Sequence, residues 1–182
     1  MTRQTLTTGQ APRFPEAFAL YEQSFPVHER RTRAAQQGRI GTPDYHFDLI
    51  LEGEELQGIL LWWQTGSLRY VEHFAIAPQL RGTGVGSRAL KAFLQEGDPV
   101  LLEIDPPVEE IARRRQGFYE RNGFRANPYP HIHPPYRRGF LGHDLVVMTS
   151  PGAISPEEYR DFARYLDQVV MADCKPPLEE TE

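Results

Sequence analysis

The sequence contains a single cysteine, Cys174, among its 182 residues. No disulfide can therefore form within the chain, which excludes a small scaffold held together by disulfides and favours a reducing compartment. Cys174 also lies near the end of the chain and outside any recognisable motif, so we expect an incidental thiol rather than a nucleophile. From this usage we expect the protein to be cytoplasmic.

Long apolar runs and an excess of positive charge are also missing. The longest apolar run, residues 59–63, is far too short to cross a bilayer. The first residues have no apolar core, so we expect no signal peptide. A formal net charge of −5 disfavours a nucleic-acid partner and slightly favours cationic substrates such as amines. We therefore expect neither a membrane nor a nucleic acid as a partner.

The remaining composition is that of an ordinary globular protein. Hydrophobic residues make up 40% of the chain and charged residues 25%, and 182 residues suffice for one domain with a sizeable core. We expect a single domain over residues 1–182, as a monomer or a homodimer. An amphipathic helix at about 155–172, with Ser155 as its N-cap, is expected as an addition at its C-terminal end.

The most informative stretch runs from Tyr70 to Gln95. It begins with a short apolar β-favouring segment, and it ends with apolar residues at helical spacing. Between them stand three glycines at alternate positions, in Arg81-Gly82-Thr83-Gly84-Val85-Gly86. Glycine lets the backbone take positive φ and lets a ligand come close, and a helix start directs unpaired N–H groups at that ligand. The stretch therefore predicts a binding site for an anion, most plausibly a pyrophosphate.

The glycine spacing separates this loop from two commoner ones. A P-loop needs a Lys-Ser or Lys-Thr pair after its last glycine, whereas Ser87-Arg88 follows here. The dinucleotide fingerprint needs Gly-x-Gly-x-x-Gly, whereas this loop is Gly-x-Gly-x-Gly. The loop instead resembles the acyl-CoA loop of the GNAT acetyltransferase superfamily, with Arg81, Gly84 and Gly86 filling that family's pattern.

A second block strengthens this resemblance. Phe118-Tyr119-Glu120-Arg121-Asn122-Gly123-Phe124 is similar to the GNAT signature Phe/Leu-Tyr-Glu-x-x-Gly-Phe, and it lies at the family's distance from the glycine loop. The two motifs cover roughly the central third of the chain. They imply an α/β (α+β) GNAT fold, with a mixed sheet of six to seven strands, helices on both faces and splayed central strands.

The resemblance also implies a function, the transfer of an acetyl group from acetyl-CoA to a primary amine of a small molecule or peptide by direct attack. Acetyl-CoA would be the co-substrate, with no metal. The implied cofactor contacts are the backbone of the fourth strand, which pairs with pantetheine, and the glycine loop with the start of its helix, which holds the pyrophosphate: Phe74, Ala75, Ile76, Arg81, Gly82, Thr83, Gly84, Val85, Gly86 and Ser87. A non-catalytic module that binds or senses acyl-CoA is the alternative function.

Three residues are candidates for the proton transfers. Tyr119 aligns with the family's tyrosine that protonates the departing thiolate. Glu72 is our first candidate for the base, because it lies two residues before Phe74 and hence on the same strand face. Glu103 on the adjacent strand is the rival, and a water relay or an amine that binds already neutral is the third possibility.

The acceptor side is less determined by the sequence. We predict a helix over residues 28–37, ended by Gly38, and the resemblance makes His28 and Glu29 substrate-contact candidates; a solvated helix face of Glu29, Arg30, Arg31 and Arg33 is the alternative. The long segment 126–142 contains His131 and His133, which suggest a metal site only weakly because no third ligand accompanies them. We expect structural or substrate-wall histidines there. The role of the run Arg113–Arg115 is left open.

Overall fold

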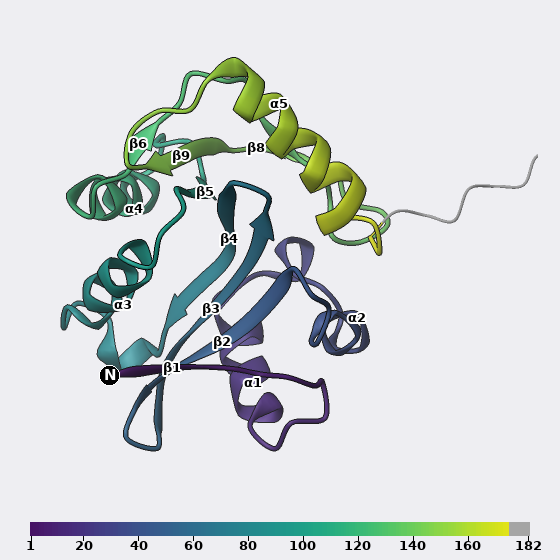
Figure 1. Ribbon diagram of the computed structural model, residues 1–182, viewed down its shortest axis with the longest axis vertical. Coiled ribbons are helices and arrows are strands. Elements are labelled where there is room, and N and C mark those ends of the chain that lie inside the picture. Colours follow the sequence, from purple (N-terminus) through teal and green to yellow (C-terminus); the bar gives the residue numbers. More distant parts are fainter. Residues whose placement is uncertain (175–182) are drawn as a thin grey trace, which may run out of the picture.

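We analysed a computed structural model of the chain, which describes residues 1–174. Its centre is a seven-stranded mixed sheet of strand order β1-β2-β3-β4-β5-β9-β6 (Figure 1). All neighbouring strands are antiparallel except β4 and β5, which run parallel. The expected mixed sheet of the GNAT fold is confirmed.

The N-terminal half of the sheet is built from local antiparallel pairs. Its strands are β1 (Thr2–Thr5), β2 (Tyr45–Glu52), β3 (Glu55–Thr65) and β4 (Leu68–Ile76). A tight turn with Gly53 at φ 58° joins β2 to β3. Residues 58–61 and Trp63 in the middle of β3 are buried, which agrees with a strand that is covered on both faces there.

The C-terminal half continues the sheet through β5 (Val100–Ile104), β9 (Val146–Ser150) and the short β6 (Arg125–Ala126). A separate two-stranded sheet of β7 (Ile132–His133) and β8 (His143–Asp144) is formed by the long segment after β6. The sequence gives no strong strand signal there, because two residues per strand are too few for a period-2 pattern.

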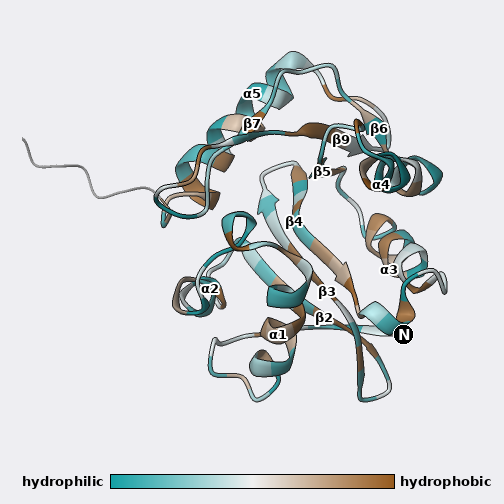
Figure 2. Cartoon of the chain, turned by 180° about the vertical axis from the view of Figure 1, so that it is seen from behind, coloured by the Kyte–Doolittle hydropathy of each residue, from teal (hydrophilic) through white to brown (hydrophobic). Residues whose placement is uncertain are grey.

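Helices cover both faces of the sheet. On one face, α1 (Phe14–Ser24) and α5 (Pro156–Tyr165) contribute Phe14, Phe18 and Phe162 to a core that includes Tyr70 and Trp63. On the other face, α3 (Val85–Leu94) and α4 (Glu110–Arg121) bury Leu90, Phe93 and Tyr119. These apolar side chains are buried against residues of the sheet, and Figure 2 shows hydrophobic stretches of the ribbon in α3 and β4.

The terminal helix begins directly after Ser155, the residue expected as its N-cap. Ser155 accepts a hydrogen bond from the backbone N–H of Glu158, whose carboxylate accepts one from the backbone N–H of Ser155. After Tyr165 the helix widens to a π-turn over Leu166–Val170. Residues 175–182, the end of the expected domain, lie outside the described residues. Within residues 1–174, no helix combines the length and apolar character needed to cross a bilayer.

The predicted helix over residues 28–37 is wrong. A 3-10 turn spans Val27–Glu29, Arg30 is extended, and α2 begins only at Arg33 and continues through Gly38 to Arg39. The interruption has a tertiary cause, because the Arg31 side chain is drawn into the core and its backbone N–H donates to the Tyr21 hydroxyl at 3.0 Å. Thr32 then caps α2 by accepting from the Ala35 N–H.

Candidate active site

The two halves of the sheet separate at the middle of the molecule. β4 and β5 pair only at residues 69–71 with 100–102, and within the described chain β4 has no strand partner on that side beyond Val71. A cleft of about 590 Å³ opens where they diverge. Its walls come from β4, the glycine loop, β5 and α4, so the splayed central strands expected from the sequence are present.

The cleft leaves a strand edge available for pairing. Glu72, Phe74 and Ile76 are each partly exposed, although the Glu72 side chain itself is buried completely. The exposed part of Glu72 is therefore its backbone. An extended ligand in the cleft could use the free N–H and C=O groups of this edge as a further strand would.

The glycine loop closes one end of the cleft. Gly82 and Gly84 have φ values of 81° and 84°, a region that favours glycine. Gly86 lies in the first turn of α3, where an added Cβ would stand 3.3 Å from Ile76 Cγ1 and 3.5 Å from the Phe118 ring. The first turn of α3 carries no acidic residue. The loop thus combines two glycines in the left-handed region with a helix N-terminus whose first turn carries no acidic side chain. This arrangement is suited to binding phosphate groups.

Most of the predicted cofactor residues line this cleft. They are Phe74, Ala75, Ile76, Arg81, Gly82, Gly84, Gly86 and Ser87. Thr83 and Val85 do not: the Thr83 hydroxyl donates to the Leu80 carbonyl at 2.6 Å, and Val85 is buried in the core. Arg81 donates from Nε to the Ile76 carbonyl at 3.2 Å, which fixes the loop to the end of β4.

Tyr119 lies at the end of α4 and lines the same cleft. Its ring packs between Phe118 and Phe124, with centroid separations of 5.1 and 5.6 Å. The hydroxyl has no hydrogen-bond partner among residues 1–174. Burial raises the pKa of Tyr119 to about 12, with a smaller opposing effect of Arg115. The phenol is therefore a proton donor whose proton is present throughout the neutral range.

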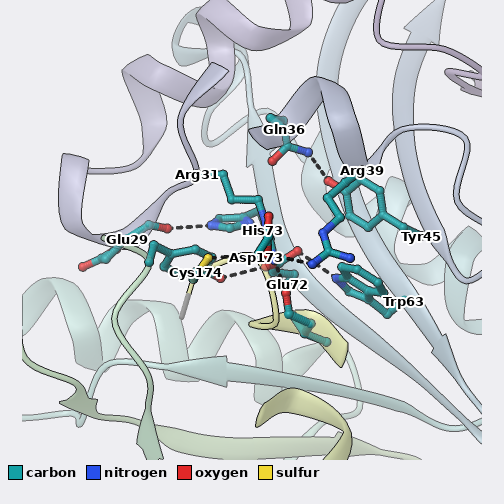
Figure 3. Close-up of polar contacts among 12 residues, drawn as sticks. Glu29, Arg31, Gln36, Arg39, Tyr45, Trp63, Glu72, His73, Asp173 and Cys174 are labelled. Atoms are coloured by element: carbon teal, nitrogen blue, oxygen red, sulfur yellow. Dashed lines mark hydrogen bonds and ion pairs between the residues drawn. The ribbon is translucent and has the colours of Figure 1, made fainter. Parts of the chain in front are cut away.

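Glu72 is in the middle of a buried polar cluster (Figure 3). Its carboxylate pairs with the Arg31 guanidinium, and both side chains are completely buried. It also accepts from Trp63 Nε1 at 2.9 Å and from the Tyr136 hydroxyl at 2.9 Å. Burial alone would raise the pKa of Glu72, but Arg31, His73 and these hydrogen bonds together lower it. A carboxylate held in this way is a poor proton acceptor.

Arg31 is one of the residues near the cleft whose role the sequence did not indicate. Besides Glu72, it contacts Asp173 at 3.2 Å and the Val170 carbonyl, so it ties the C-terminal segment to β4. Arg39 pairs with the same Asp173 at 2.7 Å. The expectation of a solvated helix face therefore fails for Arg31. Its position in a run of charged residues carried no signal of burial, because the partner Glu72 is 41 positions away.

Glu103 is also fully engaged. It accepts from the Tyr70 hydroxyl, contacts His131 Nε2, and lies 3.8 Å from His133 Nε2. Burial raises the pKa of Glu103, and His133, His131 and the Tyr70 hydroxyl outweigh that effect, so the net direction is downward. His131 in turn contacts the Tyr159 hydroxyl at 3.0 Å. Both predicted carboxylates face the cleft region, and both are held as anions.

A smaller cavity of about 80 Å³ adjoins the cleft. The two cavities share five residues, namely Phe25, Glu72, His73, Glu103 and Arg115. Glu29 and His133 line the smaller cavity, whereas His28 does not and instead stacks on Phe140 at 5.7 Å. Of the three arginines left open by the sequence, Arg115 lines both cavities and pairs with Asp105 at 2.6 Å.

No group of three or more His, Cys, Asp or Glu side chains within residues 1–174 has the geometry to hold a metal ion. His131 and His133 instead both face Glu103, with Ile132 between them turned outward. This pattern follows from the alternation of a strand. His131 therefore has a structural role, whereas His133 lies in the wall of the smaller cavity.

Comparisons with known proteins agree with this geometry. Residues 43–126 match the family model of the acetyltransferase (GNAT) domain. Among curated proteins, YjbC of Bacillus subtilis, described as an acetyltransferase, is 24% identical over 103 residues, which are 56% of this chain and 52% of YjbC. The match thus spans about half the length of that relative.

Solved structures extend the likeness over nearly the whole chain. A protein of Bacteroides thetaiotaomicron, described as a GNAT-family acetyltransferase, is 28% identical, with a TM-score of 0.88 over 93% of this chain and 98% of that one. An aminoglycoside 6'-N-acetyltransferase with bound coenzyme A is 14% identical, with a TM-score of 0.60 over 86% and 99%, and shows the shared fold alone. The matched family model, the splayed strands and the glycine loop agree that residues 43–126 form a GNAT acetyltransferase domain.

Proposed function

We propose that this protein is an N-acetyltransferase that moves an acetyl group from acetyl-CoA to a primary amine of a small molecule or peptide. One observation carries the proposal: the cleft between β4 and β5 has a glycine loop at one end, and in its wall lies the Tyr119 hydroxyl, which has no hydrogen-bond partner within residues 1–174. Residues 1–182 would form a single domain for this purpose.

Each part of acetyl-CoA has a suitable counterpart in the cleft. The pyrophosphate would lie on the backbone N–H groups of residues 81–87, at the positive end of α3. Pantetheine would pair with the free edge of β4 at residues 74–76, which has no strand partner there in the described chain. A backbone N–H of the same edge would donate to the thioester carbonyl as negative charge develops on its oxygen.

Tyr119 would protonate the departing thiolate. Its hydroxyl is uncommitted within the described chain and its pKa of about 12 keeps the proton available. The acceptor amine would enter through the smaller cavity, which meets the cleft at Glu72 and Glu103. Glu29 at that cavity supports its role as an acceptor contact. His28, stacked on Phe140 outside both cavities, would contribute only to the rim.

Glu72 and Glu103 stay candidates for the base, but their surroundings favour other roles. Glu72, paired with Arg31, would fix β4 against the C-terminal segment. Glu103, in contact with two histidines, would hold negative charge next to the attacking nitrogen.

The test is turnover of acetyl-CoA, measured as free thiol, with a panel of an alkylamine, spermidine, an aminoglycoside and a peptide with a free N-terminus. We expect turnover with at least one amine and formation of the acetylated product by mass. Tight acetyl-CoA binding without turnover of any amine would support the non-catalytic module instead. No binding of acetyl-CoA at all would contradict both functions.

A further inference from the structure

The wall of the smaller cavity contains a histidine nitrogen for which the described chain provides no partner. His133 is 2% exposed, whereas its neighbour Ile132 is 65% exposed, because β7 alternates between the cavity and solvent. The pairing of His133 with His143 in β8 fixes this orientation. Nε2 of His133 is buried without a hydrogen bond within residues 1–174.

The other ring nitrogen determines the state of Nε2. Nδ1 of His133 lies 2.6 Å from the Pro134 carbonyl oxygen, which can only accept, so Nδ1 carries the hydrogen. In the neutral ring Nε2 therefore has a free lone pair. Stacking of the ring on Tyr136, at 5.0 Å and an interplanar angle of 21°, holds this lone pair in place.

The charged group nearest to Nε2 is a carboxylate. Glu103 on β5 has Oε2 at 3.8 Å, and the carboxylate of Glu72 on β4 lies beyond Tyr136. The opposing groups are His73 on β4 and His143 on β8, together with Arg115 on α4, which is paired with Asp105. An imidazolium at His133 would thus have a carboxylate as its nearest charged neighbour.

His73 is the competing candidate, because its Nδ1 is also buried and unpartnered in the described chain. Burial, opposed chiefly by the Glu72 charge, lowers the pKa of His73 to about 4. A ring of that basicity holds a proton poorly at neutral pH. No carboxylate oxygen of the described chain contacts His73 directly, whereas His133 has one at 3.8 Å.

We propose that His133 Nε2 accepts the proton of the attacking amine, and that Glu103 stabilises the imidazolium that forms. The inference rests on the proposed acetyl transfer and assigns its base. The lone pair of a neutral amine becomes the new C–N bond to the thioester carbonyl carbon, and one proton of the now positive nitrogen passes to Nε2. The C–S bond then breaks with its electron pair on sulfur, which takes the Tyr119 proton, and the imidazolium returns a proton to the phenolate through solvent.

The first test is His133→Gln, assayed with the panel amine of highest kcat/KM and expressed per concentration of neutral amine. Wild-type kcat/KM should fall at acidic pH, because a base that already carries a proton cannot accept one from the amine. In His133→Gln this acid limb of the pH–rate profile, the decrease of kcat/KM at acidic pH, should disappear. The rate should also fall by about 10²-fold, in the range typical for a lost general base, while acetyl-CoA affinity stays unchanged. His46→Gln is the matched control, since His46 stacks on Trp62 and lines neither cavity.

Glu103→Gln separates this base from a carboxylate base. Loss of the neighbouring anion destabilises the imidazolium, so the acid limb should move to lower pH. If Glu103 itself were the base, the limb would disappear in Glu103→Gln and persist in His133→Gln, and the inference would be wrong.

Chemical rescue provides a measurement that a merely structural role would not change. In His133→Ala, added imidazole should raise the rate in proportion to its free-base concentration, and His46→Ala should not respond. A folded His133→Ala that binds acetyl-CoA but ignores imidazole would contradict the inference, as would a wild-type pH profile in His133→Gln. Absence of wild-type turnover with every amine would overturn the proposed function, and this inference with it.

Discussion

At the scale of single residues, identical side chains in adjacent strands have surroundings that the sequence does not distinguish. Glu72 and Glu103 both follow apolar strand residues, yet one is paired with an arginine and the other with histidines. The pKa of each carboxyl is lowered, because these partners outweigh the effect of burial. Arginine stays charged at every accessible pH, whereas histidine can exchange a proton. Only the Glu103 cluster therefore suits proton transfer.

Replacing Glu72 should destabilise the protein more than it changes the chemistry. Glu72→Gln removes the completely buried carboxylate that pairs with Arg31 and leaves only the partly exposed Asp173 beside it, which should cost about 3 kcal/mol in the free energy of unfolding. The surface variant Glu110→Gln, which breaks an exposed pair with Arg114, should cost less than about 0.5 kcal/mol. Urea unfolding of both variants measures the difference. Equal costs would mean that the Arg31 pair contributes no more than a surface pair.

Tyr119→Phe keeps the ring that packs on Phe118 and Phe124 and removes only the hydroxyl. Because that hydroxyl has no partner in the described chain, stability and acetyl-CoA affinity should be unchanged. The rate should fall by about 10²-fold, as is usual when a general acid is lost. Steady-state kinetics and calorimetric binding test this, with Tyr129→Phe as a control outside the cleft. Undiminished turnover would reduce Tyr119 to a core residue.

At the scale of elements, Gly66 between β3 and β4 provides a control for a substitution at Gly84 in the glycine loop. Gly84 and Gly66 have φ values of 84° and 65°, so aspartate is strained at both positions. Only Gly84 lines the cleft. Gly84→Asp should therefore weaken acetyl-CoA binding by at least about 10-fold, since it adds a negative charge where phosphate would lie. Gly66→Asp should lose similar stability and keep its affinity. Equal affinities in the two variants would contradict the phosphate site.

The elements also show what the sequence could and could not predict. The strand-loop-helix at 70–95 and the terminal helix that begins after Ser155 were predicted because local periodicity, glycine spacing and a capping residue specify them. The interruption at Arg31 could not be predicted, because it depends on a contact with Glu72, 41 positions away. The β7–β8 pair could not be predicted either, because two residues per strand are too few for a period-2 pattern. The same holds for the site: the motif residues of the cleft were found, whereas Arg31, His73 and Tyr136 were not.

At the scale of the whole molecule, the histidines couple stability to pH. His73 is enclosed by the rings of Tyr21, Phe25 and Tyr136 and donates from Nε2 to the Glu29 carbonyl at 2.8 Å. It thereby joins α1, β4 and the long segment before β8 in one buried contact. Protonating it would place a charge among these layers, so the folded protein resists taking up that proton.

The resulting prediction concerns the free energy of unfolding at mildly acidic pH. Burial lowers the pKa of His73 from 6.5 to about 4 in the folded protein. Between these values the unfolded chain binds a proton that the folded chain does not, so stability is fully present above pH 6.5 and falls as the pH decreases. From pH 6.5 to pH 5 the loss should be about 2 kcal/mol.

His73→Phe should remove most of that loss, because phenylalanine occupies the same aromatic enclosure without titrating. His28→Phe is the control for the same substitution at a half-exposed ring, and it should keep the wild-type pH dependence. Urea unfolding at about pH 7, pH 6 and pH 5 gives the slopes, whose difference isolates the proton bound by residue 73. If His73→Phe lost stability as steeply as the wild type over this range, the proton would bind elsewhere, and the enclosure of His73 would have no part in the pH response.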